Sequence, residues 1–415
     1  MSIPRLPGGA IGLESAVFPQ GPALNPDSRP APAAIEAPFP TLARPYDAAA
    51  LADLVARYGS PLLVVDCDVA RSQYRRLAAA LPGVSLHYAL KPLPVPAVVT
   101  TLAAEGAHFD LATDGEVNLV RDAGIDPARC IHTHPIKRDA DIRHALAYGV
   151  TTFVVDNPDE MAKFAPYAGR AGLLIRLSFR SPEAVVDLSR KFGCDPDTAL
   201  ELMRVAKRLG VEVRGLSFHV GSQSRSPETK VHAIDACGTL MAEARREGLA
   251  ALGTLDIGGG FPIDYVQPAT PIEEFCAPIR VALARLPADT RVIAEPGRFI
   301  CGPAGIVLTT VMGRAFRDGR WWYYLDDGLY GSFSGQLYDH ARYPVEPLFP
   351  GDGVPEPSVL AGPTCDSVDV IAEDLALPPL RAGDILVGRQ MGAYTWASAT
   401  DFNFFPRARI LPVNV

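Results

Sequence analysis

The chain has 415 residues, which is too long for one ordinary domain and suits two. Its net charge of −8 argues against nucleic acid or an anionic membrane as a partner, whereas a small cationic substrate would not be repelled. The seven cysteines are scattered, without a CxxC pair or a His/Cys cluster, so we expect neither a disulfide framework nor a metal site. Unpaired thiols, together with the lack of a secretory signal or a membrane-spanning apolar run, predict a cytoplasmic protein.

Residues 1–45 are rich in Pro, Ala and Gly and lack helical or strand periodicity, which predicts a flexible N-terminal extension. A short helix at 47–58 and a strand at 61–66 follow. From residue 84 onward, short apolar segments alternate with amphipathic segments rich in Ala and Leu. The expected strands are 84–90, 107–112, 129–133, 151–155, 172–178, 213–219, 253–257 and 291–295. The expected helices between them include 95–104, 114–123, 138–148, 197–209, 228–247 and 273–286.

Repeated strand–helix units indicate parallel strands that are buried on both faces. A closed (β/α)8 TIM barrel over residues 46–300 fits this repeat, and an open doubly wound sheet is the competing architecture. After residue 300 the alternation stops, and short strand-like runs with Gly and Pro between them predict a β-domain over residues 301–415. The strand at 61–66 is expected to pair into that β-domain. The predicted fold class is therefore α/β, with a barrel and a mostly β C-terminal domain.

The segment HYALKP (87–92) places Lys91 at the end of the first barrel strand, and prolines at 92, 94 and 96 prevent the strand from continuing. Active sites of such barrels lie at the C-terminal ends of the strands. A lysine at this position can form an imine with a carbonyl compound. Taken alone, Lys91 would be interpreted as a surface lysine. The residues at the ends of the other expected strands favour a chemical role for it.

Asp110 ends the second expected strand and His219 ends the sixth. Glycines 258–260 follow the seventh strand, and the segment EPGR (295–298) follows the eighth. Loops after the last two strands of such barrels commonly bind phosphate, because glycine lets backbone N–H groups approach an anion closely. A phosphate site beside an imine-forming lysine indicates pyridoxal 5'-phosphate as the cofactor.

Three further side chains suit that cofactor. Glu295 can hold the pyridine nitrogen protonated, so that the ring withdraws electrons fully. His219, in the segment SFHVGS (217–222), can stack on the ring face, although a lone histidine is more often a core residue. Ser222 can add a hydrogen bond to the phosphate.

The C-terminal region offers two more candidates. In the segment GPTCD (362–366), Cys365 is flanked by turn and acidic residues rather than by apolar ones, which makes it the best candidate for a functional thiol. Asp339, in the segment LYDH (337–340), is a second acidic candidate.

Taken together, these motifs resemble the fold-type III pyridoxal-phosphate-dependent amino-acid decarboxylases, and most closely the ornithine decarboxylase branch of the Orn/Lys/Arg/diaminopimelate decarboxylase family. That family combines an alanine-racemase-like barrel with a β-domain. The matching segments run in order along most of the chain: YALKP (88–92), FDLATDGEV (109–117), DLSRKFG (187–193), SFHVGS (217–222), LDIGGGFP (255–262), AEPGR (294–298), DDGLYGSF (326–333), LYDH (337–340), GPTCDSVD (362–369) and MGAYT (391–395).

The resemblance implies a role for each matching residue. Lys91 would bind the cofactor covalently, His219 would stack on it and Glu295 would pair with its ring nitrogen. Cys365 would protonate the substrate carbon after CO2 has left. Asp110 and Arg176 would support the site. The residues around the phosphate would be Ser222, Gly259, Gly260, Gly297, Arg298 and Tyr394.

The resemblance also implies a head-to-tail homodimer with two shared active sites. Cys365 and Asp366 would serve the partner subunit's site. Asp339 and Asp366 would bind the distal ammonium of a diamino acid, and Tyr330 would lie at the interface beside the substrate.

The implied reaction is decarboxylation of L-ornithine to putrescine, a step of polyamine biosynthesis. Cys365-Asp366-Ser367 differs from the Cys-Glu-Ser of diaminopimelate decarboxylases, and Glu295 differs from the arginine of alanine racemases. The chain departs from the family pattern at residues 92–94, at His134 and at Gln223, so lysine, arginine or another diamino acid, in specialised metabolism, stays an alternative substrate. A catalytically silent regulatory paralogue is disfavoured, because the residues expected to hold the cofactor are present.

Overall fold

The computed structural model of the chain describes residues 39–179, 184–186 and 191–415. Residues 1–38, which make up most of the predicted extension, lie outside the described residues. Residues 187–190, at the start of the segment DLSRKFG, also lie outside them.

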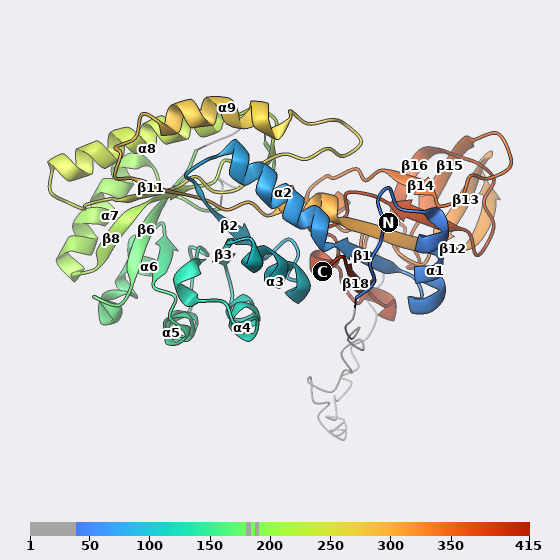
Figure 1. Cartoon of the computed structure of the whole chain (residues 1–415), viewed down its shortest axis with the longest axis horizontal. Coiled ribbons are helices and arrows are strands. Elements are labelled where there is room, and N and C mark those ends of the chain that lie inside the picture. The colour runs from blue at the N-terminus through green and yellow to red at the C-terminus, as the bar shows by residue number, and fades with distance from the viewer. Residues whose placement is uncertain (1–38, 180–183, 187–190) are drawn as a thin grey trace, which may run out of the picture. The chain divides into compact units, whose positions relative to one another are not determined.

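Eight parallel strands close into a barrel, in the order β10-β11-β2-β3-β4-β5-β6-β8. Figure 1 labels β2, β3, β6, β8 and β11 among them. Their apolar side chains are buried, as expected for strands that face both a barrel interior and a layer of helices. The predicted barrel is therefore confirmed, and the open sheet is excluded. The barrel strands are β2 (Ser85–Ala89), β3 (His108–Leu111), β4 (Cys130–His132), β5 (Thr152–Val155), β6 (Gly172–Leu177), β8 (Glu212–Phe218), β10 (Thr254–Asp256) and β11 (Arg291–Ala294).

Helices alternate with these strands along the chain and pack around them (Figure 1). The helix over 67–80 has no counterpart in the sequence analysis; it begins where the Asp66 side chain accepts hydrogen bonds from the N–H groups of Asp68 and Val69. The helices of the barrel are α2 (Cys67–Ala80), α3 (Pro96–Ala104), α4 (Asp114–Asp122), α5 (Asp139–Tyr148), α6 (Pro158–Ala162), α7 (Pro196–Leu209), α8 (Glu228–Arg246) and α9 (Ile272–Leu283).

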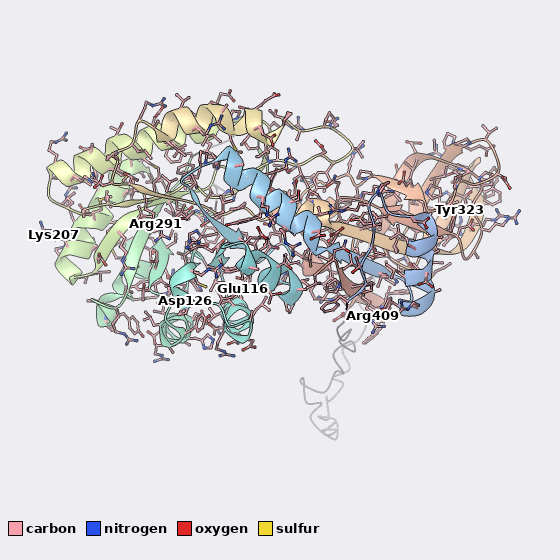
Figure 2. All side chains as sticks on the ribbon, in the orientation of Figure 1. Glu116, Asp126, Lys207, Arg291, Tyr323 and Arg409 are labelled. Atoms are coloured by element: carbon pink, nitrogen blue, oxygen red, sulfur yellow. The ribbon has the colours of Figure 1, made fainter. Side chains whose placement is uncertain are left out.

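A second sheet of eight strands is formed mainly by residues beyond 300. Its fully buried strand β1 pairs antiparallel with β12 and parallel with β18, although it precedes the barrel in sequence. Tyr323 belongs to this sheet (Figure 2). Its ring is buried, and its hydroxyl accepts a hydrogen bond from the Leu380 N–H at 3.1 Å. The strands are β1 (Leu62–Asp66), β12 (Gly305–Arg317), β13 (Arg320–Leu325), β14 (Val345–Pro347), β15 (Glu356–Ala361), β16 (Val370–Leu377), β17 (Ile385–Gly388) and β18 (Arg409–Val413).

Barrel and second sheet together form the predicted fold class, which is confirmed. The described residues from 39 onward group as one unit, so the domain boundary placed at residue 300 stays a prediction. Within the described residues, no helix is both long and apolar enough to cross a membrane. The remaining elements are β7 (Ala184–Val186), β9 (Ser222–Ser224), α1 (Ala48–Tyr58), α10 (Arg298–Cys301) and α11 (Gly335–Tyr338).

Two buried histidines of the barrel wall resist protonation. Burial, with the nearby His108, lowers the pKa of His87 to about 3. Burial, with the nearby Lys137, lowers the pKa of His132 to about 3 as well. Neither ring nitrogen of His132 has a hydrogen-bond partner in another described residue. Because both pKa values lie below those of the unfolded chain, the stability that these rings confer is present above about pH 6.5 and is lost as the pH falls toward 3.

Replacing His132 by Phe removes one of these titrations while keeping a ring against Phe153, whose centroid lies 5.8 Å away. The free energy of unfolding of the wild type should fall relative to that of the variant by about 1.4 kcal/mol per pH unit below about pH 6. Urea denaturation at a series of pH values measures this difference. Parallel pH curves for the two proteins would contradict the assignment of a buried neutral His132.

Candidate functional site

The C-terminal ends of the barrel strands bring the predicted barrel residues together. Lys91 follows β2, Asp110 lies in β3, Arg176 lies in β6, and His219 directly follows β8. Glu295 directly follows β11. Lys91 interacts electrostatically with Asp110, Glu295 and Arg176, and His219 interacts with Lys91 and Arg176. Residues spread over the sequence thus share one charged cluster at the barrel mouth.

Lys91 is the central cation of this cluster. Its ammonium group is surrounded by protein, although the residue as a whole keeps some solvent exposure. Burial alone would lower the pKa of its ammonium group, but electrostatic interactions with Tyr394, Asp110 and Glu295 outweigh that effect and raise it. Lys91 is therefore protonated in the protein alone and balances carboxylates that water does not solvate.

The carboxyl groups of the cluster are correspondingly hard to ionise. Burial, followed by the charge of Glu295, raises the pKa of Asp110 well above its usual range, although Asp110 accepts a hydrogen bond from the Thr133 hydroxyl. Burial and the neighbouring Asp256 raise the pKa of Glu295 in the same way. Burial likewise raises the pKa of Asp256 to about 6, so these neighbouring carboxyl groups resist ionising together.

His219 is held as a neutral ring. Its Nδ1 accepts a hydrogen bond from the Gly221 N–H at 3.0 Å, which leaves the ring proton on Nε2. Burial and the adjacent cations Arg176 and Lys91 keep the pKa of His219 well below 6.5. A neutral imidazole at the barrel mouth can pack against a flat aromatic ligand without adding charge.

The glycines after β10 form a backbone turn that has no room for side chains. Gly258 and Gly260 have φ angles of +65° and +89°, which L side chains rarely adopt. A Cβ on Gly259 would lie 2.6 Å from the Glu295 carbonyl oxygen and 3.1 Å from His219 Nε2. No described residue accepts a hydrogen bond from the N–H of Gly259 or Gly260, so both donors are available to a ligand.

Arg298, the first residue of α10, completes this turn with a buried positive charge. Its guanidinium group donates to the Tyr265 hydroxyl at 2.5 Å and to Ser222 Oγ at 3.2 Å, and forms an ion pair with Asp339. It also lies over the Tyr394 ring, 4.7 Å from the centroid. Its buried Nε has no hydrogen-bond partner among the described residues.

The predicted residues at 297 and 394 pack against the first strand end. A Cβ on Gly297 would lie 2.6 Å from Pro92 Cγ, so the chain there must be glycine. The Tyr394 N–H donates to the Pro92 carbonyl at 3.1 Å. Pro92, at which the chain departs from the family pattern, thus contacts both the segment after β11 and the segment that carries Tyr394.

This set of residues fits pyridoxal 5'-phosphate. The unpartnered Arg298 Nε and the free N–H groups of Gly259 and Gly260 are donors for a phosphate. Lys91 supplies the amine, and Glu295 supplies a carboxyl group for a ring nitrogen.

Three of the predicted site residues, Tyr330, Cys365 and Asp366, lie elsewhere in the described chain. Cys365 and Asp366 are in the loop between β15 and β16, and Cys365 is exposed whereas the other cysteines are buried. The Cys365 N–H donates to Asn403 Oδ1 at 3.0 Å, and Asp366 accepts from the Tyr330 hydroxyl, which lowers the Asp366 pKa. Among the described residues, none of the three contacts Lys91.

Asp256 and Lys230 also belong to the site and escaped the sequence analysis. Lys230 is fully buried beneath the glycine turn. Its position on α8 was a usable signal, because it occupies the same helix face as the buried residues Ala233, Ile234 and Cys237. The pairing of Asp256 with Glu295 had no signal in the sequence, since it depends on how the two strand ends meet.

The chain departs from the family pattern at Gln223, and the structure shows what this side chain does. Gln223 has a φ angle of 51°, where glycine would be unstrained. Its side chain accepts from the Ile263 N–H at 2.9 Å and donates to the Ile263 carbonyl at 3.0 Å. These two hydrogen bonds offset the strain and tie the segment after β8 to the segment after β10.

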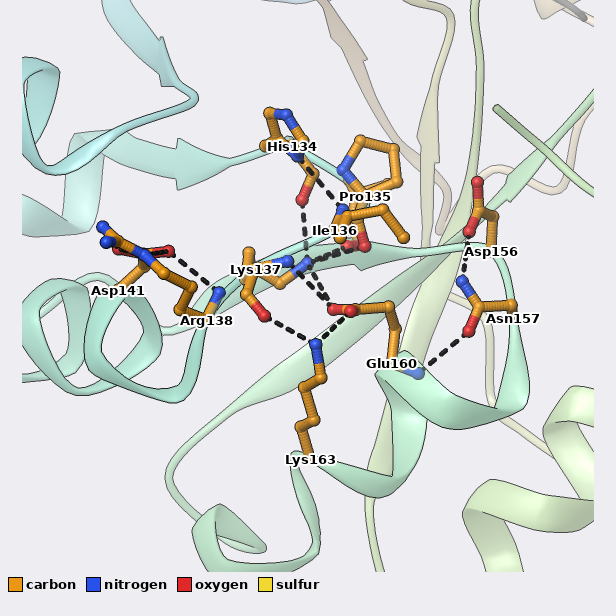
Figure 3. A network of polar contacts seen from close by, with 11 residues as sticks. His134, Pro135, Ile136, Lys137, Arg138, Asp141, Asp156, Asn157, Glu160 and Lys163 are labelled. Atoms are coloured by element: carbon orange, nitrogen blue, oxygen red, sulfur yellow. Dashed lines mark hydrogen bonds and ion pairs between the residues drawn. The ribbon is translucent and has the colours of Figure 1, made fainter. Parts of the chain in front are cut away.

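A second buried lysine anchors the loop after β4 (Figure 3). Lys137 Nζ donates to the carbonyls of His134 at 2.8 Å, Pro135 at 3.1 Å and Val154 at 2.6 Å. Its backbone N–H donates to Glu160, which also pairs with Lys163. The loop is therefore fixed from below by a cation with all three donors used.

The comparisons with known proteins agree with this geometry. Residues 68–302 match the family described as pyridoxal-dependent decarboxylase, pyridoxal binding domain. The chain is 38% identical to the lysine/ornithine decarboxylase of Selenomonas ruminantium over 85% of this chain and 89% of that one. It is 35% identical to the ornithine decarboxylase of Mus musculus over 84% and 79% of the two chains. The chain therefore belongs to the pyridoxal-dependent decarboxylase family, which confirms the predicted enzyme class and cofactor.

Solved structures point the same way. The lysine/ornithine decarboxylase of Vibrio vulnificus in complex with cadaverine has a TM-score of 0.86 and 55% identity, covering 90% of this chain and 100% of that one. The arginine decarboxylase of Paramecium bursaria Chlorella virus has a TM-score of 0.83 and 30% identity, covering 88% and 100%.

The tight fit at Gly259 can be tested against a matched glycine. Gly259→Ala should weaken pyridoxal-phosphate binding about tenfold or more, because overpacking by one methyl group costs about 1–3 kcal/mol and here displaces the phosphate turn. Gly253→Ala is the control, since a Cβ there meets nothing within 4 Å. Fluorescence titration of each apoprotein with the cofactor gives the dissociation constants. Equal constants for the two variants would show that Gly259 does not shape the cradle.

Proposed function

We propose that the chain decarboxylates a basic L-amino acid with a distal ammonium group, with L-ornithine as substrate and putrescine and CO2 as products. The convergence of Lys91, Glu295 and the Arg298–Asp339 pair on one barrel mouth carries this proposal. L-lysine is the second candidate, because the similar enzymes of Selenomonas ruminantium and Vibrio vulnificus are named lysine/ornithine decarboxylases.

Pyridoxal phosphate, when bound, supplies an electron sink that takes up the electron pair left on Cα when CO2 departs. Lys91 would hold the cofactor through its amine and would be released when the substrate amine takes its place. Glu295, beside Asp256, would hold a proton at the ring nitrogen. His219 would cover the ring face as a neutral imidazole.

The phosphate would be held by donors that have no partner among the described residues. Gly259 and Gly260 offer their N–H groups, and Arg298 offers its Nε and its charge. Ser222 and Tyr394 line the same place beside Arg298. Asp110 and Arg176 balance the charge around Lys91.

Asp339 and Asp366 are proposed to bind the distal ammonium. A carboxylate in a poorly solvated pocket favours a cation over a neutral or acidic group. Asp339 is mostly buried and paired with Arg298, whereas Asp366 is bonded to Tyr330 away from Lys91. For both carboxylates to face one substrate, Asp366 has to come from a second copy of the chain.

This placement supports a head-to-tail homodimer with two shared sites. The partner subunit's Cys365 would donate the proton to Cα after CO2 leaves, and Tyr330 would lie at the interface. Exposure of Cys365, when the other cysteines are buried, agrees with a thiol that acts on another subunit. The seven free thiols support a reducing cytoplasm as the place of action.

The substrate assignment is tested by mass-spectrometric product detection with L-ornithine, L-lysine, L-arginine and meso-diaminopimelate in separate reactions. Putrescine is expected as the main product, with cadaverine second, because one methylene changes selectivity by only about 1–3 kcal/mol. Asp366→Ala should lose the preference for diamino acids. Agmatine as the main product would identify L-arginine as the substrate, and lysine would identify meso-diaminopimelate. Unchanged selectivity in Asp366→Ala would show that Asp366 does not bind the distal ammonium.

Shared sites predict complementation between two inactive variants. Lys91→Ala and Cys365→Ala homodimers should each be inactive or nearly so. Mixed and allowed to exchange subunits, they should regain up to about a quarter of wild-type activity, since half of the dimers then contain one intact site. Activity assays before and after exchange decide this; no recovery despite confirmed exchange would place Lys91 and Cys365 in the same subunit's site.

A further inference from the structure

Lys230, the third residue of α8, is buried at 0% exposure under the glycine turn that follows β10. Its ammonium lies between two aromatic rings, 5.7 Å from the centroid of Phe218 and 4.8 Å from that of Phe261. No described carboxylate forms an ion pair with it, in contrast to Lys137, which has Glu160 at 3.9 Å. Burying such a charge is costly, so the hydrogen bonds it makes must compensate.

Those hydrogen bonds end on the glycine turn itself. Lys230 Nζ donates to the Ile257 carbonyl at 2.7 Å and to the Gly259 carbonyl at 3.0 Å. The two other carbonyls of the turn have backbone donors: the Glu295 N–H reaches Gly258 at 2.9 Å, and the Ser224 N–H reaches Gly260 at 3.1 Å. Every carbonyl from 257 to 260 is therefore fixed from within the protein.

Fixing a carbonyl also fixes the N–H of the next residue, because both belong to one planar peptide and point in opposite directions. The peptide that joins Gly259 to Gly260 has its carbonyl on Lys230, so the Gly260 N–H points away from Lys230. That N–H has no acceptor among the described residues. Without the ammonium, this glycine peptide could rotate and present its carbonyl to the ligand instead.

We propose that Lys230 is a positioning residue for the cofactor phosphate: it holds the Gly259–Gly260 peptide with its N–H toward the phosphate and places a positive charge beneath the turn. The inference rests on the proposed binding of pyridoxal phosphate and assigns part of that binding to a residue that does not touch the ligand. The phosphate recognised by the turn is thus held by backbone dipoles that a buried cation orients.

The charge of Lys230 agrees with this role. Burial lowers its pKa to about 8, against the opposing influence of Cys276, Asp256 and Glu295. At neutral pH the ammonium group therefore keeps its proton and all of its donors.

The chain supplies a matched control in Lys137. It is also buried, its pKa is likewise lowered to about 8 by burial, and it also donates to backbone carbonyls (Figure 3). Its carbonyl partners lie in the loop after β4 and in β5, not in the glycine turn. Lys137→Met thus removes a similar buried ammonium without touching the phosphate turn.

The test compares pyridoxal phosphate with pyridoxal, which has the same aldehyde but no phosphate. Full-length wild type, Lys230→Met and Lys137→Met are titrated with each compound, and the borohydride-reduced adduct on Lys91 is quantified by mass spectrometry. Lys230→Met should weaken binding of pyridoxal phosphate about tenfold or more and leave pyridoxal binding within about twofold, since only the phosphate contacts change. In Lys137→Met the ratio of the two affinities should stay at the wild-type value.

Lys230→Gln, which keeps an N–H donor without the charge, should lose part of the phosphate preference and also serves if the Met variant does not fold. An unchanged preference in a folded Lys230 variant, or an equal loss for both compounds, would overturn the role of Lys230. Wild type that binds neither compound would instead contradict the proposed cofactor.

Discussion

Charge compensation at the barrel mouth is the constraint on which the rest of the site depends. Asp110, Glu295 and Asp256 are carboxyl groups removed from water, and each would be too costly to ionise without a neighbouring cation or a shared proton. Lys91 provides that cation at the end of β2, and its own protonation depends on Asp110 and Glu295. A change of charge at any one of them therefore alters the others, so the cluster titrates as a unit.

The barrel and most of its mouth could be predicted from the sequence because both follow from local patterns. Short apolar segments between amphipathic helices fix the parallel strands, and parallel strands bring their C-terminal ends to one rim. Lys91, Asp110, His219 and Glu295 each lie at such an end, so their convergence needed no knowledge of long-range contacts. Glycines 258–260 were identifiable for the same reason.

The features that escaped prediction depend on three-dimensional neighbours. Lys230 lies on the apolar face of its helix, which signals its burial, but its carbonyl partners follow only from the packing of α8 against the glycine turn. The helix over 67–80 contains three arginines, and this polar composition made its apolar face hard to recognise in the sequence. Cys365 and Asp366 could be recognised by their motif, but one chain alone does not bring them to Lys91. Their site stays a prediction about two chains.

Strand β1 ties the earliest part of the described chain to the latest. It lies between β12 and β18, and Leu62 pairs with both Leu308 and Arg409. During synthesis this strand, apolar except for Asp66, leaves the ribosome well before β12 and β18, so its pairing in the second sheet cannot form until the end of the chain has been made. Closing the second sheet therefore orders a large loop, which makes slow folding an expected property of this topology.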